Sequence, residues 1–186
     1  MDADLRALRD WGASTVVMLM ETHELEFVCV PDLGERVSRT GLRWWHLPMV
    51  DGGVPDARFE YASNRAGEDL RRRLVAGERI VVLCRGGLGR TGIVAARLQV
   101  EFGEEPESAL FRVRRARTGT VENWLHEEFV RDWWRCRLFS ESGRWAGLRR
   151  HSRRGLARHH RLLSESLGIA AVSGSLGLVL RRGSVE

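Results

Sequence analysis

Lysine is absent from this chain of 186 residues, so all 30 basic side chains are arginine. We attribute this to codon bias, because nothing in folding requires it. Cysteine is also scarce, and Cys29, Cys84 and Cys136 are too few and too scattered for a disulfide framework or a zinc site. An odd number of cysteines at these spacings favours free thiols in a reducing compartment.

Long hydrophobic runs are missing as well. Residues 1–10 are charged and do not resemble a signal peptide. The longest late apolar stretch, residues 167–180, contains glycine and serine and is 14 residues long, short of the ~20 needed to cross a bilayer. The sequence therefore predicts a soluble, cytoplasmic protein without a membrane partner.

Charge is distributed unevenly along the chain. Residues 135–186 hold 11 arginines against 3 glutamates, whereas residues 1–134 hold 19 arginines against 22 acidic residues, so the excess behind the net charge of +5 lies in the last quarter. Hydrophobic periodicity is also lost after about residue 139. We therefore expect one domain over residues 1–139 and an Arg-rich, partly disordered tail over residues 140–186. Nucleic-acid binding would rest on this tail alone, which argues against it as the function of the whole chain.

Short apolar runs alternate with longer amphipathic segments over the predicted domain. The runs that predict strands are residues 14–20, 42–47 and 79–84. The segments that predict helices are residues 22–26, 32–39, 56–76, 91–102, 106–117 and 123–138. Strands that alternate with helices favour an α/β fold with a central, mostly parallel sheet flanked by helices.

Residues 84–91 form the most informative segment of the sequence. They read Cys-Arg-Gly-Gly-Leu-Gly-Arg-Thr and lie where a predicted strand turns into a predicted helix. A cysteine and an arginine at this spacing alone would occur about 0.5 times by chance in such a composition. With glycine at positions 87 and 89 and serine or threonine at 91, the chance expectation falls to roughly 0.0005. The pattern therefore indicates a specific kind of site.

This turn has the features of a phosphate-binding loop with a nucleophile. Backbone N–H groups between residues 84 and 90 can point inward and surround three phosphate oxygens, and the glycines of the turn allow the backbone to approach a ligand closely. The positive end of the following helix favours the thiolate form of Cys84, which makes it the candidate nucleophile. Arg90 is suited to hold two phosphate oxygens at once, and the Thr91 hydroxyl can donate to the thiolate.

A thiolate that attacks phosphorus requires a general acid for the departing oxygen. Asp51 is the candidate, because it lies in a loop rich in proline and glycine, residues 48–55, directly after a predicted strand. A mobile loop suits an acid that must move over a bound phosphate. Since aspartate before two glycines is also a common turn residue, a purely conformational role is the alternative.

Together with the upstream segment Leu47-Pro-Met-Val-Asp51, residues 84–91 resemble the cysteine-dependent dual-specificity protein phosphatases. The similarity is greatest to the kinase-associated phosphatase (cyclin-dependent kinase inhibitor 3-like) branch and its bacterial relatives. It covers about residues 10–135 and includes residues 112–122. The resemblance implies a protein-tyrosine-phosphatase-like fold, hydrolysis of phosphotyrosine with phosphoserine and phosphothreonine as further substrates, a phosphorylated protein as partner, and no cofactor or metal.

The resemblance also implies roles for individual residues. It assigns a phosphocysteine intermediate to Cys84 and the work of acid and then base to Asp51. The phosphate would be bound by the Arg90 side chain and by the backbone of the residues before it, which are Arg85, Gly86, Gly87, Leu88 and Gly89.

The sequence departs from the family pattern at two positions, and both bear on the rate of turnover. The family usually has histidine immediately before the cysteine, whereas this chain has Leu83. His126 aligns with a glutamine that positions the attacking water in the family. A helix-surface position without a catalytic role is the alternative that we favour for His126.

Other functions compete with a working phosphatase. A pseudophosphatase would bind phosphorylated partners and turn them over poorly, which Leu83 favours. A protein that binds nucleic acid or RNA 5′-phosphate would draw on the Arg-rich tail. The spacing Gly87-x-Gly-x-x-Gly92 also matches a dinucleotide-binding fingerprint, but residues 104–117 predict a helix where that fold requires a second strand.

Overall fold

The computed structural model describes residues 1–141, 167–171 and 177–182. The strands are β1 (Ala13–Met18), β2 (Arg43–His46), β3 (Arg79–Leu83), β4 (Leu167–Ala171) and β5 (Gly177–Arg182). The helices are α1 (Asp2–Asp10), α2 (Thr22–Phe27), α3 (Leu33–Arg39), α4 (Ala57–Val75), α5 (Gly89–Glu101), α6 (Pro106–Ala116) and α7 (Trp124–Glu141). Each strand and helix predicted before residue 139 is present, with ends that differ by a few residues.

The strands form one five-stranded sheet in the order β2-β1-β3-β5-β4. β1 lies parallel to both β2 and β3, whereas β5 lies antiparallel to both β3 and β4. The α/β prediction is therefore confirmed, but the sheet is mixed rather than mostly parallel. The two C-terminal strands account for this difference.

These two strands correct the prediction of a separate tail. β5 pairs with β3 along residues Ile80–Leu83, and Leu180 of β5 is fully buried in the main hydrophobic core. Without β5, the edge of β3 that faces away from β1 would carry unpaired backbone groups. The apolar run of residues 177–180 pairs with this edge as an added strand. In the sequence, we compared the apolar stretch that contains this run only with the length of a membrane span. The rest of the predicted tail, residues 142–166, 172–176 and 183–186, lies outside the described residues.

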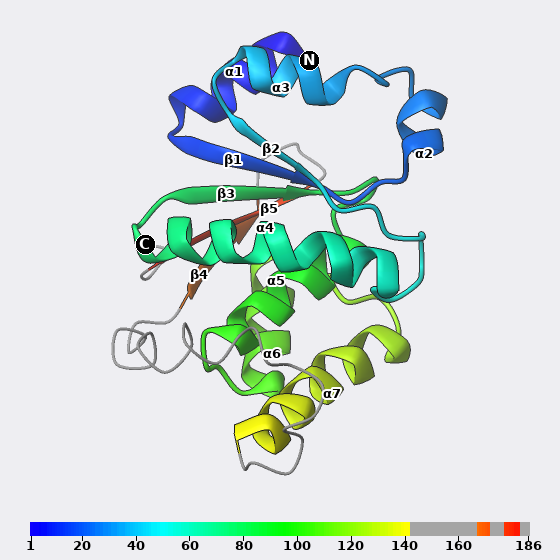
Figure 1. The fold of residues 1–186 in the computed structure, drawn as a ribbon, viewed down its shortest axis with the longest axis vertical. Helices are drawn as coiled ribbons and strands as arrows, with labels where there is room; N and C mark the ends of the chain where they lie inside the picture. The colour runs from blue at the N-terminus through cyan, green and yellow to red at the C-terminus, as the bar shows by residue number, and fades with distance from the viewer. Residues whose placement is uncertain (142–166, 172–176, 183–186) are drawn as a thin grey trace.

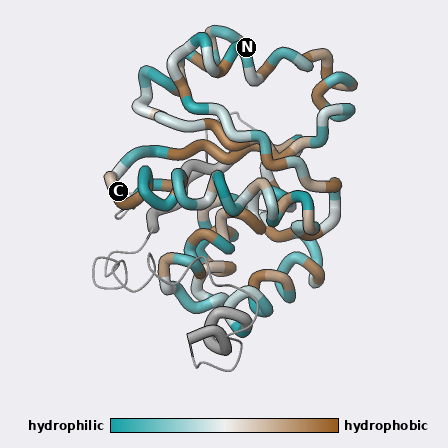
Figure 2. Tube along the Cα trace, in the orientation of Figure 1, coloured by the Kyte–Doolittle hydropathy of each residue, from teal (hydrophilic) through white to brown (hydrophobic). Residues whose placement is uncertain are grey.

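The helices cover the two faces of the sheet (Figure 1). α1 and α3 pack on one face, where Val16 and Met18 of β1 join a smaller hydrophobic cluster. α4 to α7 lie on the other face, where Val17 of β1 and Val82 of β3 belong to the main core. Figure 2 shows the hydrophobic segments concentrated along the strands between these layers. Alternation of side chains along each strand thus supplies both cores.

The parallel strands β1, β2 and β3 all end at the same edge of the sheet. Residues 19–24 follow β1, residues 47–55 follow β2, and the loop that begins at Cys84 follows β3. Ligand sites of α/β sheets form at the carboxyl ends of parallel strands, so the topology brings three sequence-distant segments to one site. Among the described residues, no helix has the length and hydrophobicity needed to span a membrane.

Candidate active site

The predicted phosphate loop, residues 84–90, joins β3 to α5. Cys84 is 3% exposed, and the backbone N–H of Gly87 donates a hydrogen bond to its Sγ over 3.1 Å. α5 begins at Gly89, and Leu88 at its N-cap provides no side-chain cap. The first amides of the helix are therefore left for an anion in the loop, and their dipoles favour negative charge there.

The glycines of the loop have different structural reasons. Gly87 has φ +68°, a left-handed conformation that favours glycine. A Cβ atom at Gly89 would clash with the end of the Glu122 side chain and lie 3.1 Å from Cε1 of His126, so neighbouring side chains crowd this position. A Cβ at Gly86 would meet open space. The backbone conformation at Gly87 and the crowding at Gly89 thus favour glycine in addition to the close approach to a ligand that the sequence suggests.

Arg90 is 1% exposed and lies at the centre of a network of oxygen atoms. Its Nη1 and Nη2 donate to the two carboxylate oxygens of Glu24 over 2.5 and 2.9 Å. Nη1 also donates to the Met49 carbonyl over 3.1 Å, and Nη2 lies 3.1 Å from Oδ1 of Asp51. Nε of Arg90 is buried and has no hydrogen-bond partner among the described residues. The guanidinium group is thus fixed by the protein and still has one unused donor.

Glu24 is a site residue that the sequence analysis missed. Burial alone would raise the pKa of Glu24, but the hydrogen bonds from Arg90 and from the Glu21 backbone hold it below its ordinary value. Burial likewise opposes the charge of Arg90, yet the bonds to Glu24 raise the pKa of the guanidinium. The only sequence signal was a glutamate at the third position of a helix that starts at the carboxyl edge of the sheet. There it also accepts from the Glu21 N–H over 2.8 Å.

Asp51 lies over the phosphate loop, as its predicted role requires. Its side chain is 67% exposed and contacts Arg90 from the acid loop, residues 48–55. The structure thus brings together Cys84, Arg90 and Asp51 from segments 33 and more residues apart. The chemical role of Asp51 stays a prediction.

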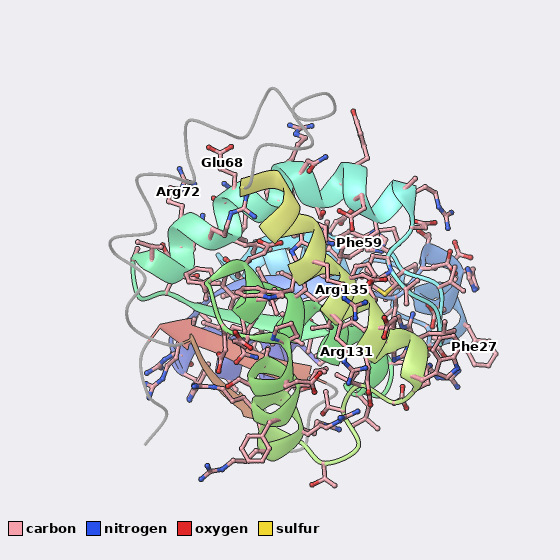
Figure 3. The ribbon with its side chains drawn as sticks, turned by 90° about the horizontal axis from the view of Figure 1, so that it is seen from below. Phe27, Phe59, Glu68, Arg72, Arg131 and Arg135 are labelled. Atoms are coloured by element: carbon pink, nitrogen blue, oxygen red, sulfur yellow. The ribbon has the colours of Figure 1, made fainter. Side chains whose placement is uncertain are left out.

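Thr91 and Arg85 occupy opposite environments. Thr91 is fully buried, and its Oγ1 has no hydrogen-bond partner among the described residues, so donation to the Cys84 thiolate stays a prediction. Thr91 lies in the first turn of α5. Arg85 is exposed at the mouth of the loop, with its guanidinium 5.9 Å from the centre of the Phe27 ring. Figure 3 shows Phe27 projecting outward at the edge of the molecule.

His126 corrects the expectation of a surface position. Its side chain is fully buried at the start of α7, and its Nε2 lies 3.2 Å from the carbonyl oxygen of Gly52 in the acid loop. Asn123 caps the same helix end, because its Oδ1 accepts from the His126 N–H over 3.0 Å. The sequence could not show this burial, since it depends on the packing of α7 against both loops.

The segment before α7 supports the phosphate loop from outside. Arg117 donates to the Gly86 carbonyl over 3.1 Å, and the Val121 N–H donates to the Leu88 carbonyl over 3.4 Å. Val121 has φ +60°, which is strained for a β-branched residue. Arg114 donates to the Val121 carbonyl over 3.1 Å. These contacts hold a strained turn against the loop.

Leu83, the first departure from the family pattern, packs away from the loop. It joins the smaller cluster beneath α1 and α3, whereas Cys84 belongs to the main core on the other face. In the part of the chain that the structure describes, no group of three or more histidine, cysteine or acidic side chains is placed to hold a metal ion.

In this fold, one loop between a central strand and a helix carries both the cysteine and the arginine. Solved structures with a similar fold are known. A kinase-associated phosphatase whose catalytic-site cysteine is substituted by serine has a TM-score of 0.65 and 26% sequence identity, covering 74% of this chain and 76% of that chain. Tk-PTP in its active form has a TM-score of 0.60 and 25% identity, covering 73% and 86%. The chain therefore has a protein-tyrosine-phosphatase-like fold.

The sequence places the chain more narrowly within this class. The family model of cyclin-dependent kinase inhibitor 3 (CDKN3) matches residues 1–109, and the chain belongs to that family. Cyclin-dependent kinase inhibitor 3 of Homo sapiens is 30% identical over 132 residues, which are 67% of this chain and 61% of that protein. The protein of Rattus norvegicus matches over the same shares. The resemblance seen in the motifs is confirmed, and the match spans less than two thirds of these relatives' length.

Proposed function

We propose that this chain is a cysteine-dependent protein phosphatase that acts on phosphotyrosine, with phosphoserine and phosphothreonine as further substrates. The convergence of Cys84, Arg90 and Asp51 at one amide-lined loop carries the proposal. One solved relative is described as a phosphatase with a catalytic-site cysteine, which supports the same role for Cys84. The free thiols of Cys29 and Cys84 fit a reducing compartment, and we place the protein in the cytoplasm.

The first step transfers the phosphoryl group to the protein. The Cys84 thiolate attacks phosphorus, so that an S–P bond forms while the P–O bond to the leaving group breaks. Arg90 and the loop amides stabilise the charge on the equatorial oxygens. The phosphate competes with Asp51 for Arg90, and the protonated carboxyl group of Asp51 donates its proton to the departing oxygen.

The second step restores the thiolate. A water molecule attacks the phosphocysteine, and the Asp51 carboxylate accepts a proton from this water. The S–P bond breaks with its electron pair on sulfur, and inorganic phosphate leaves. The cycle needs no cofactor, because the reacting groups are all side chains of this chain, water and the substrate.

The experiment that tests the proposal uses the full chain and Cys84→Ser. Serine keeps the shape of the loop but stays protonated, so hydrolysis of p-nitrophenyl phosphate and of a phosphotyrosine peptide should fall by at least about 10³-fold, toward the ~10⁶-fold loss that removal of a nucleophile can cause. Inorganic phosphate should still raise the melting temperature of the variant. Mass spectrometry of the acid-quenched parent should find one phosphoryl group on the peptide that contains Cys84. Equal activity of variant and parent would contradict the mechanism.

Leu83 favours one alternative, a pseudophosphatase. In that case the parent chain would bind a phosphotyrosine peptide and become phosphorylated at Cys84, but it would release phosphate for few turnovers. A steady-state assay beside the trapping experiment separates the two functions.

A further inference from the structure

Inside the acid loop, the Gly53 N–H donates to the Val50 carbonyl over 3.1 Å, which closes a turn around Asp51 but does not fix that turn relative to the phosphate loop. The two residues that follow Asp51 are glycines, and Gly52 has φ +70°, a conformation outside the preferred range of other residues. The Asp51 side chain is 67% exposed, so core packing does not hold it. A conformationally permissive segment needs an external contact to keep one position.

That contact is made at the Gly52 carbonyl. The buried Nε2 of His126 lies 3.2 Å from this oxygen, and Nδ2 of Asn123 lies 3.4 Å from it. The His126 ring also lies against the phosphate loop, because a Cβ atom added at Gly89 would be 3.1 Å from its Cε1. His126 therefore touches both loops that must act together.

The surrounding groups determine which atom of the ring donates. Oδ1 of Asn123 accepts from the His126 backbone N–H, which turns the amide nitrogen of Asn123 toward Gly52 and His126. The Gly52 carbonyl can only accept, and Nδ1 of His126 has no partner among the described residues. With the proton on Nδ1, Nε2 could accept from the Asn123 amide 3.2 Å away, but Nδ1 would be a buried, unpaired donor and Nε2 would face the Gly52 oxygen without a proton between them. With the proton on Nε2, the Gly52 carbonyl accepts from both His126 and Asn123. The proton therefore belongs on Nε2.

We propose that His126 is a positioning residue, whose Nε2–H holds the Gly52 carbonyl and thereby keeps Asp51 over Arg90. The inference rests on the proposed phosphatase function. It differs from the water-positioning role implied by the family resemblance, because Nε2 is engaged by Gly52 and Nδ1 is buried. His126 acts on the chemistry through the acid loop.

The base of this contact is rigid. Asn123 caps α7, and the strained turn at Val121 is held by Arg114 through the Val121 carbonyl. Strain of this kind persists only where surrounding contacts impose it. The helix end that carries His126 is therefore fixed relative to the phosphate loop, and the acid loop is the element that it restrains.

The test compares His126→Gln with His126→Met, two side chains of similar size of which only glutamine can donate. Each is assayed on a phosphotyrosine peptide, whose leaving group needs a proton, and on 2,4-dinitrophenyl phosphate, whose leaving group does not. Misplacement of a catalytic group by about 1 Å costs up to about 100-fold in rate. We expect His126→Met to lose about 10-fold to 100-fold in kcat on the peptide and less than about twofold on the activated ester. His126→Gln should restore most of the peptide activity.

A double-mutant cycle shows whether His126 acts through Asp51. In an Asp51→Asn background there is no acid to position, so His126→Met should cause no further loss on the peptide. Val130→Ala is the matched control, because Val130 is fully buried one turn further along the same helix and its side chain has no donor for the acid loop. It should lower the melting temperature without changing the ratio of the two activities.

Three results would overturn the inference. Equal losses on the two substrates, additive losses in the double variant, or a burst of product with accumulation of phosphocysteine in His126→Met would each assign His126 to another role. Hydrolysis by the parent that requires Cys84 supports the proposed function whatever His126 does. A parent without such hydrolysis would overturn the proposed function and the inference that rests on it.

Discussion

Helix α5 holds two buried arginines in chemically similar surroundings, Arg90 in its first turn and Arg97 two turns later. Both are almost fully buried, and both meet two carboxylates. All three nitrogens of Arg97 donate, to Glu60 over 2.5 and 2.9 Å and to Glu101 over 3.2 Å. Nε of Arg90, in contrast, has no hydrogen-bond partner in the part of the chain that the structure describes. This unused donor fits the proposed role of Arg90 as a phosphate ligand, whereas the donors of Arg97 are used within the protein.

The groups that contact the two arginines also differ. Arg97 is covered by aromatic rings, with its guanidinium carbon 3.7 Å from the centre of Trp133 and 5.7 Å from that of Phe59, which is labelled in Figure 3. One partner of Arg90 is Asp51, which is exposed and lies on a loop. Burial and charge are therefore shared by Arg97 and by Arg90, the arginine that we propose binds phosphate. What distinguishes them is whether a partner can leave.

The largest contrast is expected from matched changes to the two arginines. Arg90→Lys should lower phosphatase activity by about 10²–10³-fold, because a point charge cannot replace the planar guanidinium that holds two phosphate oxygens. Arg97→Lys should keep activity within about twofold, since Arg97 contacts no part of the site. Initial rates on p-nitrophenyl phosphate, corrected for the folded fraction, measure both. A comparable loss in the two variants would break the distinction.

Replacement of Asp51, the partner of Arg90 that a bound phosphate would displace, tests the same distinction. Asp51→Asn should slow hydrolysis of a phosphotyrosine peptide by about 10²-fold, the lower end of what general acid catalysis contributes. The loss on 2,4-dinitrophenyl phosphate should be much smaller, because that leaving group departs without a proton. Rates on the two substrates provide the measurement, and equal losses would show that Asp51 is only a turn residue.

Removal of Arg97, whose three nitrogens all donate, should lower the stability of the fold rather than the activity. Arg97→Met leaves Glu60 and Glu101 without this partner, and their side chains are only 31% and 14% exposed. We expect the free energy of unfolding to fall by about 3 kcal/mol, the order found when one partner of a buried ion pair is removed. Urea unfolding followed by tryptophan fluorescence measures this loss. An unchanged midpoint would mean that the aromatic contacts alone hold the helix.

Asp69 of α4 is a buried carboxylate that, like Arg97, is held by charged partners. Its replacement should have the smallest effect of these changes. Burial would raise its pKa, but hydrogen bonds from Trp45, Arg73 and Arg72 lower it from 3.8 to about 2. The pKa of Asp69 is thus lower in the folded state than in the unfolded state. Its ionised carboxylate therefore stabilises the fold fully above about pH 4, and this stabilisation is lost as the pH falls toward 2.

Asp69→Asn should therefore cost roughly 2 kcal/mol of unfolding free energy at pH 7, a shift of nearly two pKa units converted at 1.36 kcal/mol each. The difference between variant and parent should shrink as the pH approaches 2. Urea midpoints at several pH values test this. A difference that does not depend on pH would assign the loss to packing.

Local sequence patterns were sufficient to predict the strands and helices before residue 139 and part of the candidate active site. Strand β3, the loop from Cys84 to Arg90 and the helix after it could be predicted because they are contiguous in sequence, and a short apolar run followed by glycines has few other conformations. Asp51 could be proposed from its loop, but its place over Arg90 could not. Glu24 and the burial of His126 could not be predicted, since each depends on a distant element.

Periodicity, and spacing within one segment, were enough to predict the α/β class, the order of the strands and helices over residues 14–138, and a phosphate-binding loop with a candidate nucleophile. The remaining features depend on contacts between distant segments. The tertiary structure placed β5 beside β3, where the sequence had indicated a tail, because an open strand edge accepts any apolar run that reaches it. It also gave Arg90 a displaceable partner and Arg97 fixed ones, because the partners of a buried charge come from whichever elements the fold brings to it.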